Sequence, residues 1–78
     1  MNYSAGTHSA RVAGEVRAEM ARKRVTRATL AQALGKSEAT LHRRLRGQYP
    51  FNTDELEVIA SALGVTVSEL LTRAEAAA

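Results

Sequence analysis

The chain has 78 residues, enough for one small domain, and we expect no second sensing or oligomerisation domain. It contains no cysteine, which excludes disulfides and thiolate metal sites, and His8 and His42 are far apart in the sequence, without neighbours of the metal-ligand type. The net charge of +3 is unevenly distributed. Residues 22–46 carry eight basic side chains against Glu38 alone, whereas acidic side chains predominate in residues 47–78. This asymmetry indicates a polyanion-binding surface, with a merely solvated helical surface as the alternative.

The two ends of the sequence differ from its middle. Residues 1–8 are small and polar and lack the apolar segment of a signal peptide, so we expect a flexible N-terminal arm there. The predicted domain covers residues 9–75, and residues 76–78 form a C-terminal tail. No apolar run approaches the roughly 18–20 residues that span a bilayer, so we expect a cytoplasmic protein without a membrane partner.

Helical periodicity recurs along the chain, and strand signals are nearly absent, which predicts an all-α fold. The first helix is expected over residues 9–24. Its apolar stripe has residues four apart, widened by two alanines. The stripe consists of Val12, Val16 and Met20, with Ala13 and Ala21 beside it.

Two short helices follow, separated by a tight turn. Thr26 is the expected N-cap of a helix over 27–34, because its hydroxyl can accept a hydrogen bond from a free amide of the first turn. Gly35 ends that helix, and Ser37 caps the next one, over 38–46.

The helix over 38–46 has one apolar side and one polar side. Leu41 and Leu45 are four residues apart and are expected to anchor it to the core, and Gly47 ends it. The opposite side carries Glu38, Ala39, His42, Arg43 and Arg46.

Two polar pairs with a spacing of three residues predict the last two helices, because such pairs form capping boxes. Phe51 precedes the first pair and is expected to pack as a hydrophobic staple. The pairs are Asn52 with Glu55, ahead of a helix over 53–63 that Gly64 ends, and Thr66 with Glu69, ahead of a helix from Val67.

Two short helices joined by a glycine-containing turn form a helix-turn-helix. Ala31 is small where the helices must cross, and Gly35 makes the turn. The stretch from Val25 to Leu71 resembles the lambda-repressor-like, Cro/C1-type helix-turn-helix family. The resemblance rests on Leu30-Ala31-Gln32-Ala33-Leu34-Gly35, Ser37, Thr40-Leu41, Gly47, Leu56, Ile59-Ala60, Ala62-Leu63-Gly64-Val65 and Ser68-Glu69-Leu70-Leu71.

The resemblance implies a compact bundle of five helices whose third helix reads bases in the major groove of double-stranded DNA, with no cofactor. The positions that match base-contacting positions are Ser37, Glu38, Ala39 and Arg43. The positions that match phosphate-contacting positions are Thr26, Arg27, Arg46 and Gln48, to which charge adds Lys36, His42 and Arg44.

Several of these residues have more than one interpretation. Arg43 suits bidentate binding to guanine, or a phosphate contact. Ser37 can contact DNA or only cap its helix. Glu38 can accept from cytosine N4, stabilise the helix N-terminus, or form an ion pair with Arg27. The side chain of His42 contacts the DNA backbone or is solvated.

Position 44 departs from the family, which often has an apolar residue there. The stem of Arg44 is therefore expected to pack while its head reaches solvent or phosphate.

The resemblance implies a transcriptional regulator of phage or bacterial Cro/C1 type, a nucleoid-associated repressor that binds an inverted repeat as a homodimer. The alternative is a protein-interaction module, or an antitoxin-type partner, with the same fold. An enzyme is disfavoured because the sequence has no cysteine nucleophile, glycine-rich phosphate loop or metal-ligand spacing. A domain of this size also leaves little room for a small-molecule pocket.

Overall fold

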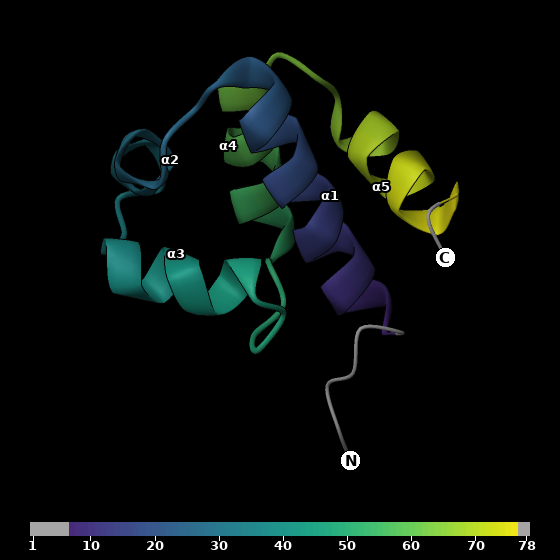
Figure 1. The fold of residues 1–78 in the computed structure, drawn as a ribbon, viewed down its shortest axis with the longest axis horizontal. Coiled ribbons are helices and arrows are strands. Elements are labelled where there is room, and N and C mark those ends of the chain that lie inside the picture. Colours follow the sequence, from purple (N-terminus) through teal and green to yellow (C-terminus); the bar gives the residue numbers. More distant parts are fainter. Residues whose placement is uncertain (1–6, 77–78) are drawn as a thin grey trace.

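The computed structural model describes residues 7–76 and consists of helices joined by short loops, with no strand among these residues (Figure 1). The predicted all-α, five-helix fold is therefore confirmed. The helices are α1 (His8–Lys23), α2 (Arg27–Leu34), α3 (Glu38–Leu45), α4 (Thr53–Leu63) and α5 (Val67–Ala76).

The outer helices differ slightly from the expected limits of the domain. α1 begins at His8 because Thr7 serves as its N-cap, with the Ala10 amide donating to Thr7 Oγ1 at 3.1 Å. α5 ends at Ala76, so the helices extend one residue beyond the predicted range of 9–75 at each end. The rest of the predicted arm and tail, residues 1–6 and 77–78, lies outside the described residues.

The predicted helix starts are present. Thr26 and Ser37 cap α2 and α3. Both capping boxes form, because in each pair the side chains and backbone amides bond reciprocally. The four bonds are Asn52 N to Glu55 Oε1 at 2.9 Å, Glu55 N to Asn52 Oδ1 at 2.8 Å, Thr66 N to Glu69 Oε1 at 2.8 Å, and Glu69 N to Thr66 Oγ1 at 3.0 Å.

The core lies where the helices meet around α1. Val12, Val16 and Met20 are buried as expected, but Ala21 is exposed, since the stripe turns away from it toward the end of α1. Phe51 packs partly buried against the core, as expected of a staple residue. The largest fully buried side chains are Leu30, Leu41, Ile59, Leu63, Leu70 and Val16.

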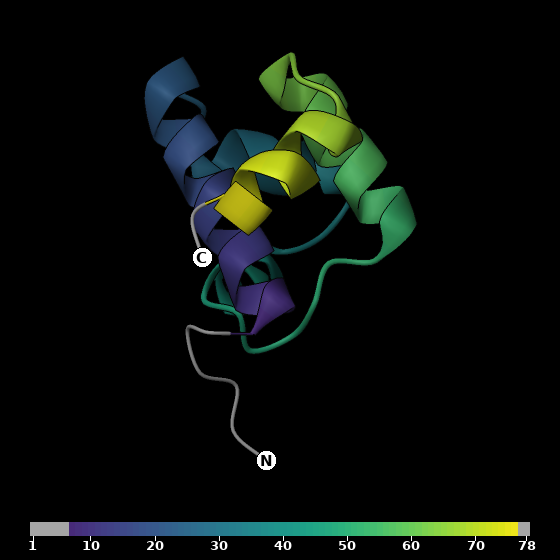
Figure 2. The same ribbon diagram turned by 90° about the vertical axis from the view of Figure 1, so that its right-hand side faces the viewer.

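The elements α2 and α3 lie on one side of α1, and α5 lies on the other. α5 contacts α1 and α4 but neither α2 nor α3. Figure 2 shows α5 in front of α1, with α2 and α3 behind. The helix-turn-helix unit is thus separated from the C-terminal helix by the body of the bundle.

Candidate nucleic-acid interface

The α2–turn–α3 unit is fixed from its inner side. Leu30 and Ala31 of α2 are buried, as are Leu41 and Leu45 of α3. Gly35 has a φ of 67°, and its amide donates to the Gln32 carbonyl at 3.1 Å. Because α3 is held by only two buried leucines out of eight residues, the rest of its surface stays accessible, and the helix forms one edge of the molecule (Figure 1).

The accessible surface of α3 is mainly polar, and its two arginines outnumber its one acidic residue. Glu38, Ala39, His42 and Arg43 are exposed along the helix, and Arg46 is exposed just after it. Three of the four sequence-predicted base contacts, Glu38, Ala39 and Arg43, are therefore exposed on α3.

The fourth predicted base contact, Ser37, has a structural role. Its Oγ accepts a hydrogen bond from the Thr40 amide at 3.1 Å and lies 3.0 Å from Thr40 Oγ1. Thr26, a predicted phosphate contact, does the same for α2, accepting from the Thr29 amide at 3.1 Å. Both residues are exposed at helix N-termini, where a backbone phosphate is favoured by the helix dipole and free amides.

An ion pair between Arg27 and Glu38, one of the three interpretations of Glu38, is not among the contacts of the described residues. Instead Arg27 Nη1 lies 2.6 Å from His42 Nδ1. Arg27 at the start of α2 thus reaches α3 one turn beyond Glu38. His42 is exposed as well as in contact with Arg27, and Glu38 has no side-chain partner in the described part of the chain.

From the sequence we expected the guanidinium of Arg44 to reach solvent or phosphate, and the structure differs. The guanidinium forms an ion pair with Glu55, the acidic member of the α4 capping box, and the Arg44 side chain is only 22% exposed. The contact ties α3 to the start of α4. The Arg44 guanidinium is expected to stay with Glu55 and not to move to a DNA phosphate. Separating the pair would leave the charge of Glu55 buried and without a cationic partner.

The remaining predicted phosphate contacts lie around the ends of α3. Lys36 is exposed but lines a cleft with two acidic residues of α4, Asp54 and Glu55. Gln48 is exposed beyond Arg46, and its backbone N–H donates to the backbone carbonyl of Arg43 at 3.1 Å.

A shallow cavity of about 220 Å³ adjoins the outer face of α3. Arg43 lines it together with Thr40, Arg44 and Tyr49. The Tyr49 ring is 57% exposed, so an aromatic surface stands beside the main candidate for base contact.

Arg17 of α1 was not predicted as a site residue, yet it lies against α3. Its Nη1 donates to the Leu45 carbonyl, which satisfies a C-terminal carbonyl of that helix. A basic residue one position away from the buried stripe was the only signal in the sequence, and it did not identify which helix the side chain would reach.

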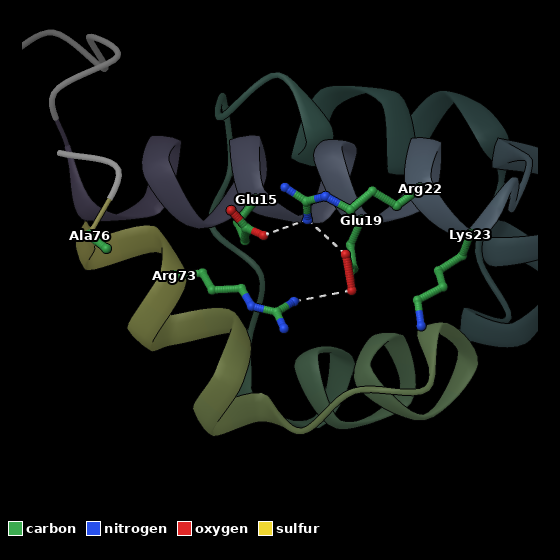
Figure 3. A pocket seen from close by; sticks show the side chains of 6 residues that line it. All are labelled: Glu15, Glu19, Arg22, Lys23, Arg73 and Ala76. Carbon is green, nitrogen blue, oxygen red and sulfur yellow. Dashed lines mark hydrogen bonds and ion pairs between the residues drawn. The ribbon is translucent and has the colours of Figure 1, made fainter.

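A second set of charged residues missed from the sequence lies between α1 and α5 (Figure 3). Arg22 Nη1 is 3.1 Å from Glu15 Oε2 and 2.7 Å from Glu19 Oε1, and Arg73 Nη1 is 3.2 Å from Glu19 Oε2. The hydrogen bond from Arg22, opposed by burial and aided by the charge of Arg73, lowers the pKa of Glu19. The spacing of Glu15, Glu19 and Arg22 on one helical side was the available signal.

Two further observations concern other classes of site. No cluster of metal-ligating side chains occurs within residues 7–76. Over the same range, every helix is too short or too polar to cross a bilayer.

A comparison with families of known proteins gives a match over most of the chain. A family model described as the Cro/C1-type HTH DNA-binding domain matches residues 15–75, which contain α2, α3 and α4 entire and nearly all of α5. Searches of the curated proteins and of the solved structures each found no match. Since the matched region contains most of the chain and the helix-turn-helix described above, the chain belongs to the Cro/C1-type family of helix-turn-helix DNA-binding domains, which act in transcription regulation and are typically not enzymes.

Proposed function

We propose that the protein is a sequence-specific regulator of transcription, a repressor of phage or bacterial Cro/C1 type that binds double-stranded DNA with α3 in the major groove. The observation that carries this proposal is the exposed surface of α3, whose buried residues are Leu41 and Leu45 and on which Arg43, with Arg46 just after the helix, outweighs the charge of Glu38. The major groove is about 12 Å wide and admits one α-helix. The outer side chains of α3 would then meet base edges.

Arg43 is the proposed main determinant of sequence preference. It is exposed, and no hydrogen bond or ion pair engages its guanidinium in the described part of the chain. A free guanidinium can donate to guanine O6 and N7 together. Glu38 is equally unpaired and suits cytosine N4, while the methyl group of Ala39 suits a thymine methyl.

Backbone phosphates are proposed to meet the cations around this face. Arg27 and His42 lie at one margin, and Arg46 and Gln48 follow the end of α3. Contacts of this kind set affinity and register and carry no sequence information. Thr26 and Ser37 contribute as caps that leave amides at the helix starts, whereas Arg44 and Lys36 face acidic residues of α4 and are the weakest members of the predicted set.

A homodimer on an inverted repeat is the proposed assembly, in the cytoplasm and on the nucleoid. Two copies would place their α3 helices about 34 Å apart, one turn of DNA. This part of the proposal rests on the family, and a selected site with two inverted halves would support it.

The experiment is a selection of bound sites from random duplex DNA, followed by affinity measurements on the winning site and on scrambled DNA. Arg43→Ala should cost about 1–3 kcal/mol on the selected site and relax the preference at one base pair. Lys23→Ala is the matched control, because it removes the same charge from the cleft between α1 and α5.

The outcomes separate the alternatives. An equal loss of affinity on all sequences would make Arg43 a phosphate contact. No binding of any duplex at low salt would contradict the proposal and favour a protein-interaction or antitoxin-type role.

A further inference from the structure

The C-terminal turn of α3 is held by side chains that connect it to two other helices, α1 and α4. Within α3 the buried residues Leu41 and Leu45 lie four positions apart, and so on one line along the helix. Among the described residues the backbone of α3 comes close to α1 and α2 but not to α4. Two leucines on one line keep the helix on the core, but they resist its rotation about that line only weakly. Contacts away from the line therefore decide in which direction the outer side chains point.

The first such contact comes from α1 and caps the end of α3. The last four carbonyl groups of an α-helix have no partner within the helix. In α3 three of them accept from backbone N–H groups that follow the helix, and the fourth, that of Leu45, accepts from Arg17 Nη1. The three backbone pairs are Arg46 N to His42 O at 3.0 Å, Gln48 N to Arg43 O at 3.1 Å, and Gly47 N to Arg44 O at 3.0 Å. The cap of the fourth carbonyl thus belongs to a different helix.

The second contact runs from Arg44 to the start of α4. The guanidinium forms an ion pair with Oε1 of Glu55, whose side chain is only 7% exposed. The same oxygen accepts from the Asn52 N–H at 2.9 Å, so the capping box fixes the carboxylate at the start of α4. Glu55 Oε2 is buried and has no hydrogen-bond partner among the described residues. The charge of this carboxylate is therefore compensated by Arg44, which keeps the pair together.

We propose that Arg17 and Arg44 are positioning residues, which fix the C-terminal turn of α3 between α1 and α4 and thereby determine how selectively Arg43 reads its base. This role rests on the proposed function and assigns a part in sequence preference to residues behind the base-reading surface. Arg43 directly precedes Arg44 and Leu45, the two residues through which the turn is held. A bidentate contact with guanine depends on the direction of the guanidinium plane, so a rotated helix would lose it.

A direct contact of Arg17 with DNA is the competing explanation. Arg17 is exposed and also lines a cleft with Arg27, His42 and Arg46, where α1, α2 and α3 meet. The two roles predict different measurements. A phosphate contact contributes about 0.9 to the salt slope on every sequence, whereas a positioning residue matters only where Arg43 recognises its base.

Glu55→Gln gives the sharper test, because charge and positioning predict opposite effects. The substitution removes a negative charge, so electrostatics alone would strengthen binding to any duplex. The amide oxygen of glutamine can still accept from the Asn52 N–H, so α4 keeps its cap. The ratio of affinities for the selected and the scrambled duplex should fall by about tenfold, within the discrimination that one bidentate base contact provides. Glu57→Gln is the matched control, since it makes the same charge change at an exposed position of α4 and should leave the ratio unchanged.

Arg17→Met tests the contact on the other side of α3. It removes the donor to Leu45, and the affinity ratio should again fall by about tenfold, while the salt slope on scrambled DNA stays at the wild-type value. Arg17→Lys keeps a cation and an N–H donor on a long side chain and should retain most of the ratio. Lys23→Met is the control on the same helix, because it loses the same charge in the cleft between α1 and α5 and should keep the wild-type ratio.

Affinities are compared at a temperature at which circular dichroism shows every variant to be folded, so that a loss of stability alone does not alter the ratio. An unchanged ratio in Glu55→Gln and Arg17→Met, with selective binding by the wild type, would overturn the positioning role and leave the proposed function standing. An equal loss on both duplexes in Arg17→Met, with a lower salt slope, would make Arg17 a phosphate contact. Tighter binding of both duplexes by Glu55→Gln would place the released Arg44 on a phosphate and contradict its positioning role. Absence of duplex binding by the wild type at low salt would overturn the proposed function itself.

Discussion

Two constraints meet at the backbone of Gly47, directly after the helix proposed to read DNA. Its φ of 78° lies in the left-handed region, and a Cβ atom there would stand 3.2 Å from Ala10 Cα. Gly64 has a φ of 72° but open space around it. An alanine at Gly64 would introduce only backbone strain, whereas an alanine at Gly47 would introduce backbone strain and a close contact with Ala10.

We predict that Gly64→Ala lowers the free energy of unfolding by about 1–2 kcal/mol, the cost of a left-handed residue with a Cβ. Gly47→Ala should cost about 1–3 kcal/mol more, because α1 and the end of α3 must move apart. Urea unfolding followed by circular dichroism measures both. Equal losses of unfolding free energy in the two variants would show that α1 can shift at Ala10 without destabilising the protein.

Arg24 presents the opposite case, since it has a φ of 56° without being glycine. It ends α1 in the left-handed conformation, with its amide donating to the Ala21 carbonyl at 3.3 Å. Arg24→Gly should raise the free energy of unfolding by about 0.5–1 kcal/mol, because relief of the strain exceeds the added entropy of the unfolded chain.

Lys23→Gly is the adjacent control and should destabilise by up to about 1 kcal/mol, since Lys23 is the last residue inside the helix. The same urea experiment applies. A destabilised Arg24→Gly variant would mean that contacts of the arginine side chain stabilise the fold by more than the backbone strain at this residue destabilises it.

At the scale of the element, the local sequence predicts where a helix starts but not which side chain of another helix an arginine contacts. The starts of α2, α3, α4 and α5 follow from residues within four positions, because capping is local. The partners of Arg27 and Arg44 belong to other helices. Their long side chains can reach several acceptors, and the choice between Glu38 and His42, or between phosphate and Glu55, depends on tertiary distances that the sequence does not contain.

The candidate site shows the same division. Exposure of Ala39 and Arg43 follows from the burial of Leu41 and Leu45 by helical geometry, because both residues lie on the opposite side of the helix. Glu38 lies three residues before Leu41 and is exposed at the first position of the helix. The cleft that includes Arg17 needs the relative placement of three helices, so no local pattern could reveal it.

The docking of α5 on α1 is predicted to weaken in acid. The lowered pKa of Glu19 means that its ionised form is favoured in the folded protein. The stabilisation is therefore present above the ordinary glutamate value of 4.5 and is lost as the pH falls through the lower folded-state pKa. The pKa of Glu69 on α5 is also lowered, chiefly by its backbone hydrogen bond with Thr66, so the two carboxylates act in the same window.

Thermal unfolding of the wild type and Glu19→Gln should therefore differ most near neutral pH, with the variant less stable. The difference should shrink below about pH 4.5, because the wild-type carboxyl becomes neutral as well. Glu57→Gln, at an exposed position of α4, is the control and should follow the wild type throughout. A constant difference at all pH values would show that packing of the side chain, and not its charge, accounts for the effect.

At the scale of the whole molecule, charge and architecture are arranged together. The helix-turn-helix and α5 lie on opposite sides of α1 and share no contacts (Figure 2). Within residues 36–48 the exposed cations Lys36, Arg43 and Arg46 outnumber the single exposed acid, Glu38. Between α1 and α5 the cations Arg22 and Arg73 are engaged by buried glutamates. The exposed cations Arg43 and Arg46 on the α3 side are therefore free to displace counterions from DNA.

This arrangement predicts a position-dependent salt effect from substitutions that change the net charge equally. Each phosphate contact contributes about 0.9 to the slope of log K against log salt. Arg46→Ala should lower that slope by about 0.9 on selected and scrambled DNA alike, since phosphates carry no sequence. Lys23→Ala should leave the slope unchanged, because Lys23 lies in the cleft between α1 and α5. Equal changes of the slope in both variants would show that DNA binding depends on the net charge of the whole protein. The proposal that α3 and its flanking cations contact the duplex directly would then be contradicted.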